Sequence, residues 1–262
     1  MHKKSTCTIV AIILVCTLFT LSLIGCGVQA GSSQATATPG RGGLHVLVFS
    51  KTTGFRHASI GDGIVALRRL AAEHHASIDA TEDAAVFSSA NLARYQVVVF
   101  LSTTGTILDA EQKAAFVSYI HAGGGYVGIH SASDTEHQWP WYGQLVGAFF
   151  KSHPQIAPAT VHVEDRHHPS TSMLPSVWSR TDEWYNFASN PRPQVHVLLT
   201  VDESSYHGGS MGRDHPIAWY HSFEGGRAWY TAMGHTSASF SEPLFLAHLW
   251  GGIVYAAGRA TA

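Results

Sequence analysis

Short apolar runs alternate with one amphipathic segment through the first part of the chain. Runs of this kind are typical of strands buried on both faces of a sheet. Between the first two runs, residues 60–75 carry apolar side chains at helical spacing, which predicts a helix with one buried face. The predicted strands are residues 45–50, 77–81, 97–101 and 126–130.

A second helix is predicted to begin after Asp109. Asp109 is a candidate N-cap, and Gln112 stands where a capping box needs an amide or a carboxylate. Phe116 and Ile120 share one face, and the glycines at 123–125 end the helix. Strands alternating with helices in this order predict a mostly parallel α/β sheet with right-handed crossovers.

The second half of the chain has shorter β segments separated by turn signals. They are predicted to add antiparallel or edge strands to the same sheet. An apolar helix with Ser241 as its candidate cap is predicted to close the chain at residues 243–256. The β segments are residues 161–163, 195–201, 217–221 and 228–231.

Ligands of parallel sheets bind beyond the carboxyl ends of the strands. Three loops follow the predicted strands at this edge, at residues 51–57, 102–106 and 130–134. We therefore expect these three loops to face one crevice.

The first 25 residues have the pattern of an export signal. Lys3 and Lys4 precede an apolar run at 9–24, and the segment that ends at Cys26 resembles a bacterial lipobox. This predicts a signal peptide over 1–25 and a lipid anchor on Cys26. The alternative is an uncleaved membrane anchor, because the run is only slightly shorter than the ~20 residues that span a bilayer. Either interpretation puts the folded part outside the cytoplasmic membrane.

Residues 26–43 are rich in Gly, Ser, Ala, Thr and Gln, which predicts a flexible tether before a domain at 44–260. Without Lys3 and Lys4, the 16 basic residues become 14 against 18 acidic ones. The charges form no basic stripe, so nucleic acid is not expected as a partner. A small carbohydrate and, through Cys26, a membrane are the expected partners.

Cysteine is confined to the leader, whereas histidine is abundant in the domain. Cys7, Cys16 and Cys26 are the three cysteines of the chain, so the domain has no thiol, disulfide or thiolate metal site. Of the 18 histidines only His2 precedes the domain. Surface positions are expected for His74, His75, His167 and His168. Candidates for chemistry, at strand ends or beside Gly, Pro or acidic residues, are His57, His130, His153, His215 and His235.

His130 stands between small residues in the segment 128–132 (Gly-Ile-His-Ser-Ala). Small neighbours permit the sharp strand-to-helix turn of a nucleophile elbow, where a hydrolase has Ser and an amidotransferase has Cys. A turn without chemistry is the alternative.

The segment 182–185 joins two acidic residues to two aromatic ones. Glu183 can act as a general acid or base or as a metal ligand, and a buried carboxylate needs a partner. Trp184 and Tyr185 can stack on a sugar or pack in the core. The aromatic stretch 139–142 can likewise line the crevice or begin a helix at Pro140.

Six segments follow one another along the chain, at residues 51–57, 124–132, 147–154, 182–185, 215–219 and 226–235. Together they resemble the ThuA family, which is named for trehalose utilisation. The resemblance implies a flavodoxin-like, class I glutamine amidotransferase-like fold and a role in carbohydrate catabolism. The expected catalytic residues are His57, His130, Asp182 and Glu183. The expected substrate-binding residues are Arg56, Ser131, Asp134, Trp184, Tyr185, His215 and Trp219.

The absence of cysteine excludes the thioester chemistry of amidotransferases. Two roles stay open for the histidines. His130, His153 and His235, with Glu183, can bind a divalent metal such as zinc. Alternatively, His130 and Glu183 can act without metal as an acid–base pair on a sugar.

Three kinds of function fit these observations. The leading hypothesis is an exported enzyme that acts on a small glycoside or a keto-sugar derivative. The alternatives are a non-catalytic sugar-binding lipoprotein, whose tryptophans stack on the sugar, and a surface scaffold.

Overall fold

The structure, a computed structural model, describes residues 43–259. The predicted signal peptide, Cys26 and all of the predicted tether except residue 43 lie outside the described residues. Within the described part, no helix combines the length and the apolar character that crossing a membrane requires.

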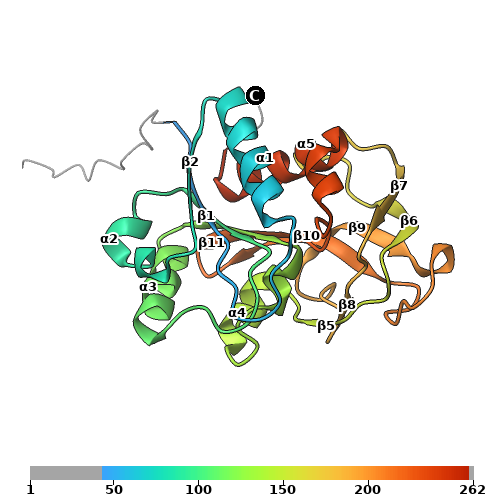
Figure 1. The fold of residues 1–262 in the computed structure, drawn as a ribbon, viewed down its shortest axis with the longest axis horizontal. Coiled ribbons are helices and arrows are strands. Elements are labelled where there is room, and N and C mark those ends of the chain that lie inside the picture. The colour runs from blue at the N-terminus through green and yellow to red at the C-terminus, as the bar shows by residue number, and fades with distance from the viewer. Residues whose placement is uncertain (1–42, 260–262) are drawn as a thin grey trace, which may run out of the picture. The chain divides into compact units, whose positions relative to one another are not determined.

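A nine-stranded mixed sheet forms the centre of the domain (Figure 1). Its order is β2-β1-β3-β4-β11-β10-β9-β6-β7; the first five strands are parallel and the last four run antiparallel to their neighbours. The strands are β1 (His45–Phe49), β2 (Ser77–Thr81), β3 (Val97–Leu101), β4 (Gly125–Ile129), β6 (Ala157–Val163), β7 (Val177–Asp182), β9 (His196–Asp202), β10 (Pro216–Phe223) and β11 (Gly226–Thr231). A two-stranded sheet pairs β5 (Phe150–Ser152) with β8 (Asn186–Phe187).

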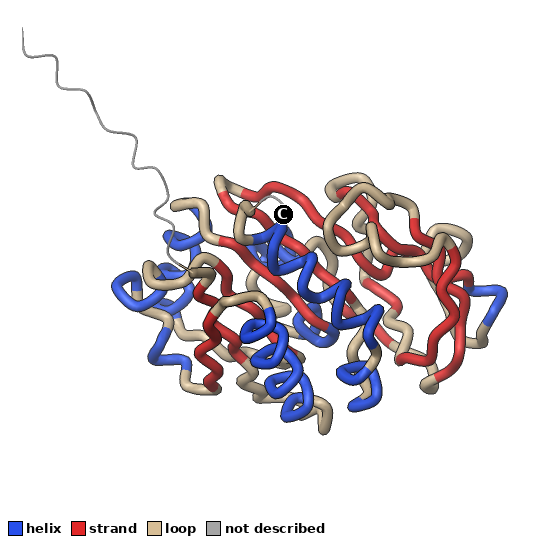
Figure 2. Tube along the Cα trace, turned by 90° about the horizontal axis from the view of Figure 1, so that it is seen from above, coloured by secondary structure: helices blue, strands red, loops and turns tan. Residues whose placement is uncertain are grey.

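Helices cover both faces of the parallel part of the sheet. In Figure 1, α1 and α5 lie over one face, and α3 and α4 lie over the other, while Figure 2 shows the same layers from above. This arrangement confirms the predicted mostly parallel α/β fold. The helices are α1 (Ile60–Glu73), α2 (Ser89–Leu92), α3 (Ala110–His121), α4 (Pro140–Val146) and α5 (Pro243–Ala256), with 3-10 turns η1 (Ala84–Val86), η2 (His130–Asp134), η3 (Glu203–Ser205) and η4 (Ser237–Ser241).

The predicted elements of the first half are confirmed to within one or two residues. At the start of α3, the Asp109 carboxylate accepts from the Gln112 backbone N–H at 2.9 Å, and the Gln112 side chain accepts from the Asp109 N–H at 3.0 Å. This is the predicted capping box. The Trp-Pro-Trp-Tyr stretch begins α4 with Pro140 in its first turn, as the second of its two interpretations expects.

The second half needs three corrections. β11 is not an added antiparallel or edge strand, because the β10–β11 hairpin inserts it in parallel beside β4. The strand β7 was not predicted, since only alternate residues are buried and two of these, Arg180 and Asp182, are charged. Ser241 does not cap α5: Glu242 is the N-cap, without a side-chain cap bond, and Pro243 starts the helix.

His168 is a further correction, because it is buried rather than on the surface. It is only 5% exposed, and its Nδ1 accepts from the Ser170 backbone N–H at 3.1 Å. His248 on α5 is fully buried and its Nδ1–H donates to the Ser170 carbonyl oxygen at 2.8 Å. The Nε2 atoms of both rings have no hydrogen-bond partner.

We expect these two histidines to make the fold acid-sensitive. Burial lowers the pKa of His248 to about 3 and that of His168 to about 4. An unfolded histidine titrates near ~6.5, so below that pH the unfolded chain binds protons that the native chain does not. The free energy of unfolding should therefore fall from pH 6.5 towards pH 4, by about 1 kcal/mol per pH unit for each ring.

Urea denaturation at several pH values measures this slope. His248→Gln cannot titrate at this position, so its slope should be smaller than that of the wild type. Replacing the exposed His207 by Gln is the matched control and should leave the slope unchanged. An equal slope in His248→Gln and wild type would show that His248 does not cause the effect.

Candidate functional site

The three loops expected to face one crevice do lie together at the carboxyl ends of β1, β3 and β4. The Thr53 N–H donates to the Thr104 carbonyl oxygen at 2.9 Å, and the Gly105 N–H donates to the Asp134 carbonyl oxygen at 2.9 Å. Backbone hydrogen bonds therefore join the loop after β1 to the loop after β3, and that loop to η2.

His130 occupies a strained turn directly after β4. Its φ is +52°, in the left-handed region that non-glycine residues rarely adopt. The Tyr230 hydroxyl donates to the His130 carbonyl oxygen at 2.8 Å and holds this conformation. The glycine two positions earlier is required by space: a Cβ on Gly128 would lie 2.7 Å from the Tyr126 hydroxyl oxygen. The geometry is therefore that of the predicted elbow.

Gly128→Ala should destabilise the fold by about 1–3 kcal/mol, because the added methyl overfills a packed region. The same substitution at Gly61 in α1 meets no atom within 4 Å. There alanine should be neutral or stabilising by up to about 1 kcal/mol. Urea denaturation of both variants measures the difference; equal stabilities would contradict the packing argument.

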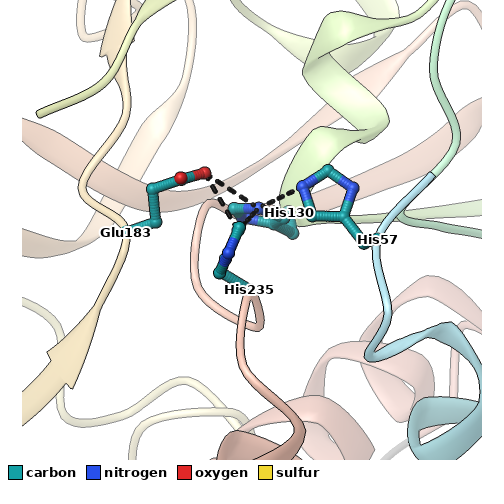
Figure 3. A group of neighbouring side chains, drawn as sticks. All are labelled: His57, His130, Glu183 and His235. Carbon is teal, nitrogen blue, oxygen red and sulfur yellow. Dashed lines mark hydrogen bonds and ion pairs between the residues drawn. The ribbon is translucent and has the colours of Figure 1, made fainter. Parts of the chain in front are cut away.

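Three histidines and one carboxylate converge beside this turn (Figure 3). His130 Nε2 lies 3.1 Å from His57 Nε2 and 3.1 Å from His235 Nδ1. Glu183 Oε2 lies 3.0 Å from His235 Nδ1 and 3.5 Å from His130 Nε2. One ligand atom from each of the four side chains lies within 4.8 Å of the others. We call His57, His130, Glu183 and His235 the histidine cluster.

Hydrogen bonding determines which ring nitrogen of His130 carries the proton and which one has a lone pair facing the cluster. Its Nδ1 lies 2.7 Å from the Ala232 carbonyl oxygen, which can only accept, so Nδ1 carries the proton. In the neutral ring Nε2 is then an acceptor with a single lone pair. His57, His235 and the Tyr185 hydroxyl all approach this one atom, the last at 3.0 Å.

One lone pair cannot accept three good hydrogen bonds, whereas a shared cation satisfies several converging lone pairs. Ligand atoms about 2.1 Å from one metal lie about 3.0 Å apart at right angles and about 3.4 Å apart at tetrahedral angles. Three separations within the cluster, of 3.0 or 3.1 Å, fall in this range, and the 3.5 Å between Glu183 Oε2 and His130 Nε2 lies just beyond it. The donor set therefore fits a divalent metal.

The pKa values of His57 and Glu183 agree with this interpretation, whereas the hydrogen bond with Glu183 raises the pKa of His235. Burial, helped by repulsion from His130 and His235, lowers the pKa of His57 to about 3. Burial alone would raise the pKa of Glu183, but hydrogen bonds and attraction from His130 and His235 lower it below its usual value. At neutral pH the cluster therefore offers a neutral imidazole and a carboxylate, the forms that bind metals.

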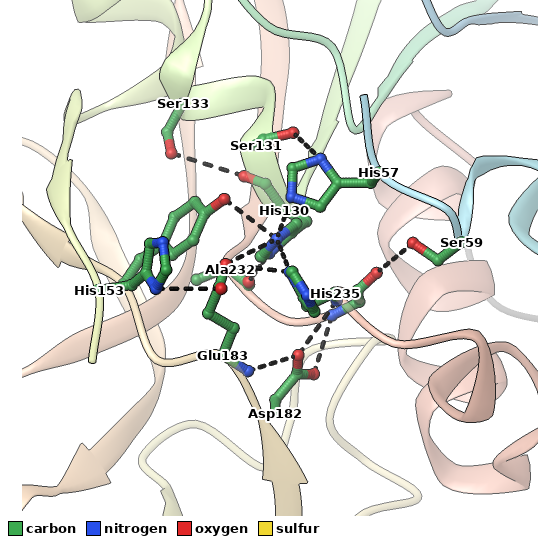
Figure 4. A network of polar contacts seen from close by, with 12 residues as sticks. His57, Ser59, His130, Ser131, Ser133, His153, Asp182, Glu183, Ala232 and His235 are labelled. Carbon is green, nitrogen blue, oxygen red and sulfur yellow. Dashed lines mark hydrogen bonds and ion pairs between the residues drawn. The ribbon is translucent and has the colours of Figure 1, made fainter. Parts of the chain in front are cut away.

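Asp182, which we expected to be catalytic, contacts the backbone of the histidine cluster and none of its ligand atoms (Figure 4). Its carboxylate accepts from the backbone N–H groups of Glu183, Gly234 and His235 at 2.9, 2.9 and 3.1 Å. It also pairs with the buried Arg180 at 3.1 Å. Asp182 is therefore a positioning residue that fixes the backbone carrying two of the ligands.

His153, expected as a metal ligand, lies outside the four-residue cluster. Its Nδ1 is 3.0 Å from Glu183 Oε1, on the side of the carboxylate away from His235, and its side chain is 44% exposed. His57, expected to be catalytic, supplies the third imidazole instead. Ser131 orients that ring, with its Oγ 3.3 Å from His57 Nδ1.

The remaining expected substrate-binding residues have other contacts. Arg56 pairs with Glu82 at 2.6 Å, and Asp134 pairs with His137 at 2.8 Å. His215 is buried, and its Nε2–H donates to the Tyr185 carbonyl oxygen at 2.8 Å, which makes it a support for Tyr185.

Trp184 and Trp219 belong to the core. Both are fully buried, and their indole N–H groups donate to the carbonyl oxygens of Ala157 and Val146 at 2.9 and 2.8 Å. Neither ring offers a face to a sugar. The carbonyl of Ala232, which orients His130, was missed because a backbone acceptor leaves no signal in the sequence.

Comparisons with known proteins agree on the fold. A ThuA-like protein from Bacteroides uniformis is 24% identical, with a TM-score of 0.68 over 84% of this chain and 95% of that one. A ThuA-like protein from Parabacteroides merdae is 20% identical, with a TM-score of 0.71 over 84% and 92%. A β-galactosidase from Bacillus circulans is 13% identical, with a TM-score of 0.53 over 82% of this chain and 31% of that one. At these identities the likeness shows the fold alone.

No curated protein matches the chain. The family model described as ThuA, trehalose utilisation, matches residues 45–256, which is nearly the whole described domain. This family links its members to carbohydrate metabolism in general. The chain belongs to the ThuA family.

Proposed function

We propose that this protein is a metal-dependent enzyme that acts on a small glycoside or a keto-sugar derivative. The observation that carries the proposal is the crowding at His130 Nε2. Three polar atoms lie 3.0 or 3.1 Å from this nitrogen, which has a single lone pair. Membership of the ThuA family supports a carbohydrate as the ligand.

Three imidazoles and one carboxylate are a ligand set that suits zinc, with other first-row divalent metals as alternatives. When bound there, a divalent cation would supply Lewis-acid polarisation of a sugar oxygen. Tyr185 would assist as a proton donor, because burial raises the pKa of its hydroxyl well above the usual value and keeps the proton on Oη. Ala232 and Ser131 would hold the rings of His130 and His57 in place.

Removing and restoring the metal tests this proposal. The protein is stripped with a chelator and reloaded separately with Zn²⁺, Mn²⁺ or Mg²⁺. Trehalose, and trehalose oxidised to a ketone at one ring hydroxyl, are then offered as substrates. We expect turnover of at least one of them, lost on chelation and restored by Zn²⁺ or Mn²⁺. Turnover that survives chelation would contradict the proposed metal dependence. It would favour acid–base chemistry by the hydrogen-bonded pair His235 and Glu183.

We propose further that the protein is exported and held at a membrane by a lipid on Cys26. The motivation is the leader, in which two lysines, an apolar run and a lipobox-like ending precede that cysteine. Labelling cells with a fatty-acid analogue and separating the membranes tests this. Label and membrane association should be lost in Cys26→Ser; a membrane-bound, unlabelled wild type would indicate an uncleaved anchor instead.

A further inference from the structure

One aromatic side chain beside the histidine cluster is exposed without a structural reason. Phe55 is 67% exposed, and among residues 43–259 it is the one Phe, Tyr or Trp side chain in the exposed class. Its ring lies 4.9 Å from the ring of the cluster residue His57, at 82°. A T-shaped contact covers at most one face of the Phe55 ring, so a face is left open next to the cluster.

The loop that carries Phe55 is held in place rather than free to fold the ring inward. The Thr104 hydroxyl donates to the Phe55 carbonyl oxygen at 2.8 Å. The backbone N–H of Thr53 donates to the Thr104 carbonyl oxygen at 2.9 Å. A Cβ on Gly54 would lie 3.2 Å from the Thr104 hydroxyl oxygen, so the two loops are packed tightly. A ligand that stacks on this ring therefore loses little free energy in ordering the loop.

From these contacts we infer that Phe55 is the stacking platform of the substrate site and selects ligands that contain a pyranose ring. One face of a pyranose is made of C–H groups and packs on an aromatic ring, while the hydroxyls at its edge stay available for polar groups. The aromatic ring and the donor cluster stand side by side, which suits a ligand with one apolar face and several oxygens. This inference rests on the proposed function and names the part of the ligand that the protein recognises.

Burial excludes the three aromatic side chains that we expected from the sequence to bind the substrate. Trp184 and Trp219 have no exposed surface, and Tyr185 is 3% exposed with its hydroxyl directed at His130. Arg56, the residue next to Phe55, pairs with Glu82, and Phe55 stays 67% exposed.

Calorimetry with trehalose and mannitol on Phe55→Ala, Phe55→Trp and wild type tests the inference. Mannitol has hydroxyls but no ring, so it lacks the flat C–H face. We expect Phe55→Ala to weaken trehalose binding about tenfold, a typical effect of losing one stacked ring. Phe55→Trp should preserve trehalose binding, and mannitol binding should be weak and equal in all three proteins.

Zinc affinity, measured on the same samples, separates failure of this inference from failure of the proposed function. Phe55 is not a ligand, so its variants should bind zinc like the wild type. Trehalose binding that is unchanged in Phe55→Ala, or absent from the zinc-loaded wild type, would overturn the platform. If the wild type binds no zinc but Phe55→Ala still weakens trehalose binding, the inference about Phe55 is supported and the proposed metal site is wrong.

Discussion

Asp182→Ala is expected to lower the free energy of unfolding by about 3–5 kcal/mol, the usual cost of removing one partner of a buried ion pair. The carboxylate is fully buried and accepts from three backbone N–H groups. Its loss leaves these donors unpaired and takes one carboxylate from Arg180, which keeps Glu242 at 3.1 Å. Urea denaturation of the metal-free protein at pH 7 measures the effect.

Two further variants test whether the loss of stability comes from the buried carboxylate of Asp182. Asp182→Asn keeps the shape and one acceptor oxygen, so its loss of stability should be smaller. Glu82→Ala removes an exposed partner of Arg56 and should cost no more than about 1 kcal/mol. A loss below about 1 kcal/mol in Asp182→Ala would show that this carboxylate does not organise the site.

His130→Asn is expected to weaken zinc binding by roughly a hundredfold or more, because the central ligand atom is lost. Asparagine is chosen because it tolerates the positive φ that His130 adopts better than alanine does. The variant should therefore fold while lacking the ring nitrogen that lies between His57 and His235.

Calorimetric titration with zinc measures this change in affinity. His137→Asn is the matched control, since His137 is an exposed histidine that pairs with Asp134 outside the cluster. The control should bind zinc like the wild type. If His130→Asn and His137→Asn bind zinc equally, the metal is not held by the histidine cluster.

The sheet could be predicted from the sequence where local pattern and tertiary context agree. The strands β1, β3 and β4 are short apolar runs, and the capping box of α3 is a local interaction of Asp109 and Gln112. The position of β11 depends instead on which neighbours it meets. An apolar segment fits equally well at an edge or between β4 and β10.

Part of the site could be predicted from the parallel strands. His57 and His130 follow parallel strands, so the carboxyl-end rule brings them together. Glu183 follows β7, at the far edge of the sheet from β2, and no local pattern places it near His130. Asp182 binds the N–H groups of Gly234 and His235 and thereby joins the end of β7 to the loop after β11.

Burial was the other quantity that the sequence did not determine. Trp184 and Trp219 were expected to reach a sugar, but each indole N–H finds a carbonyl partner inside the core. A tryptophan with a satisfied N–H is stable in the interior, so its residue type alone does not indicate exposure. Phe55 has no polar atom to satisfy and is nevertheless exposed.

X-ray absorption at the zinc edge of the zinc-loaded wild-type protein tests the central claim most directly. The account predicts one zinc per chain, bound by three imidazole nitrogens and one carboxylate oxygen at about 2.0–2.2 Å. A protein that retains no zinc after dialysis would contradict the account. So would a spectrum with only oxygen ligands.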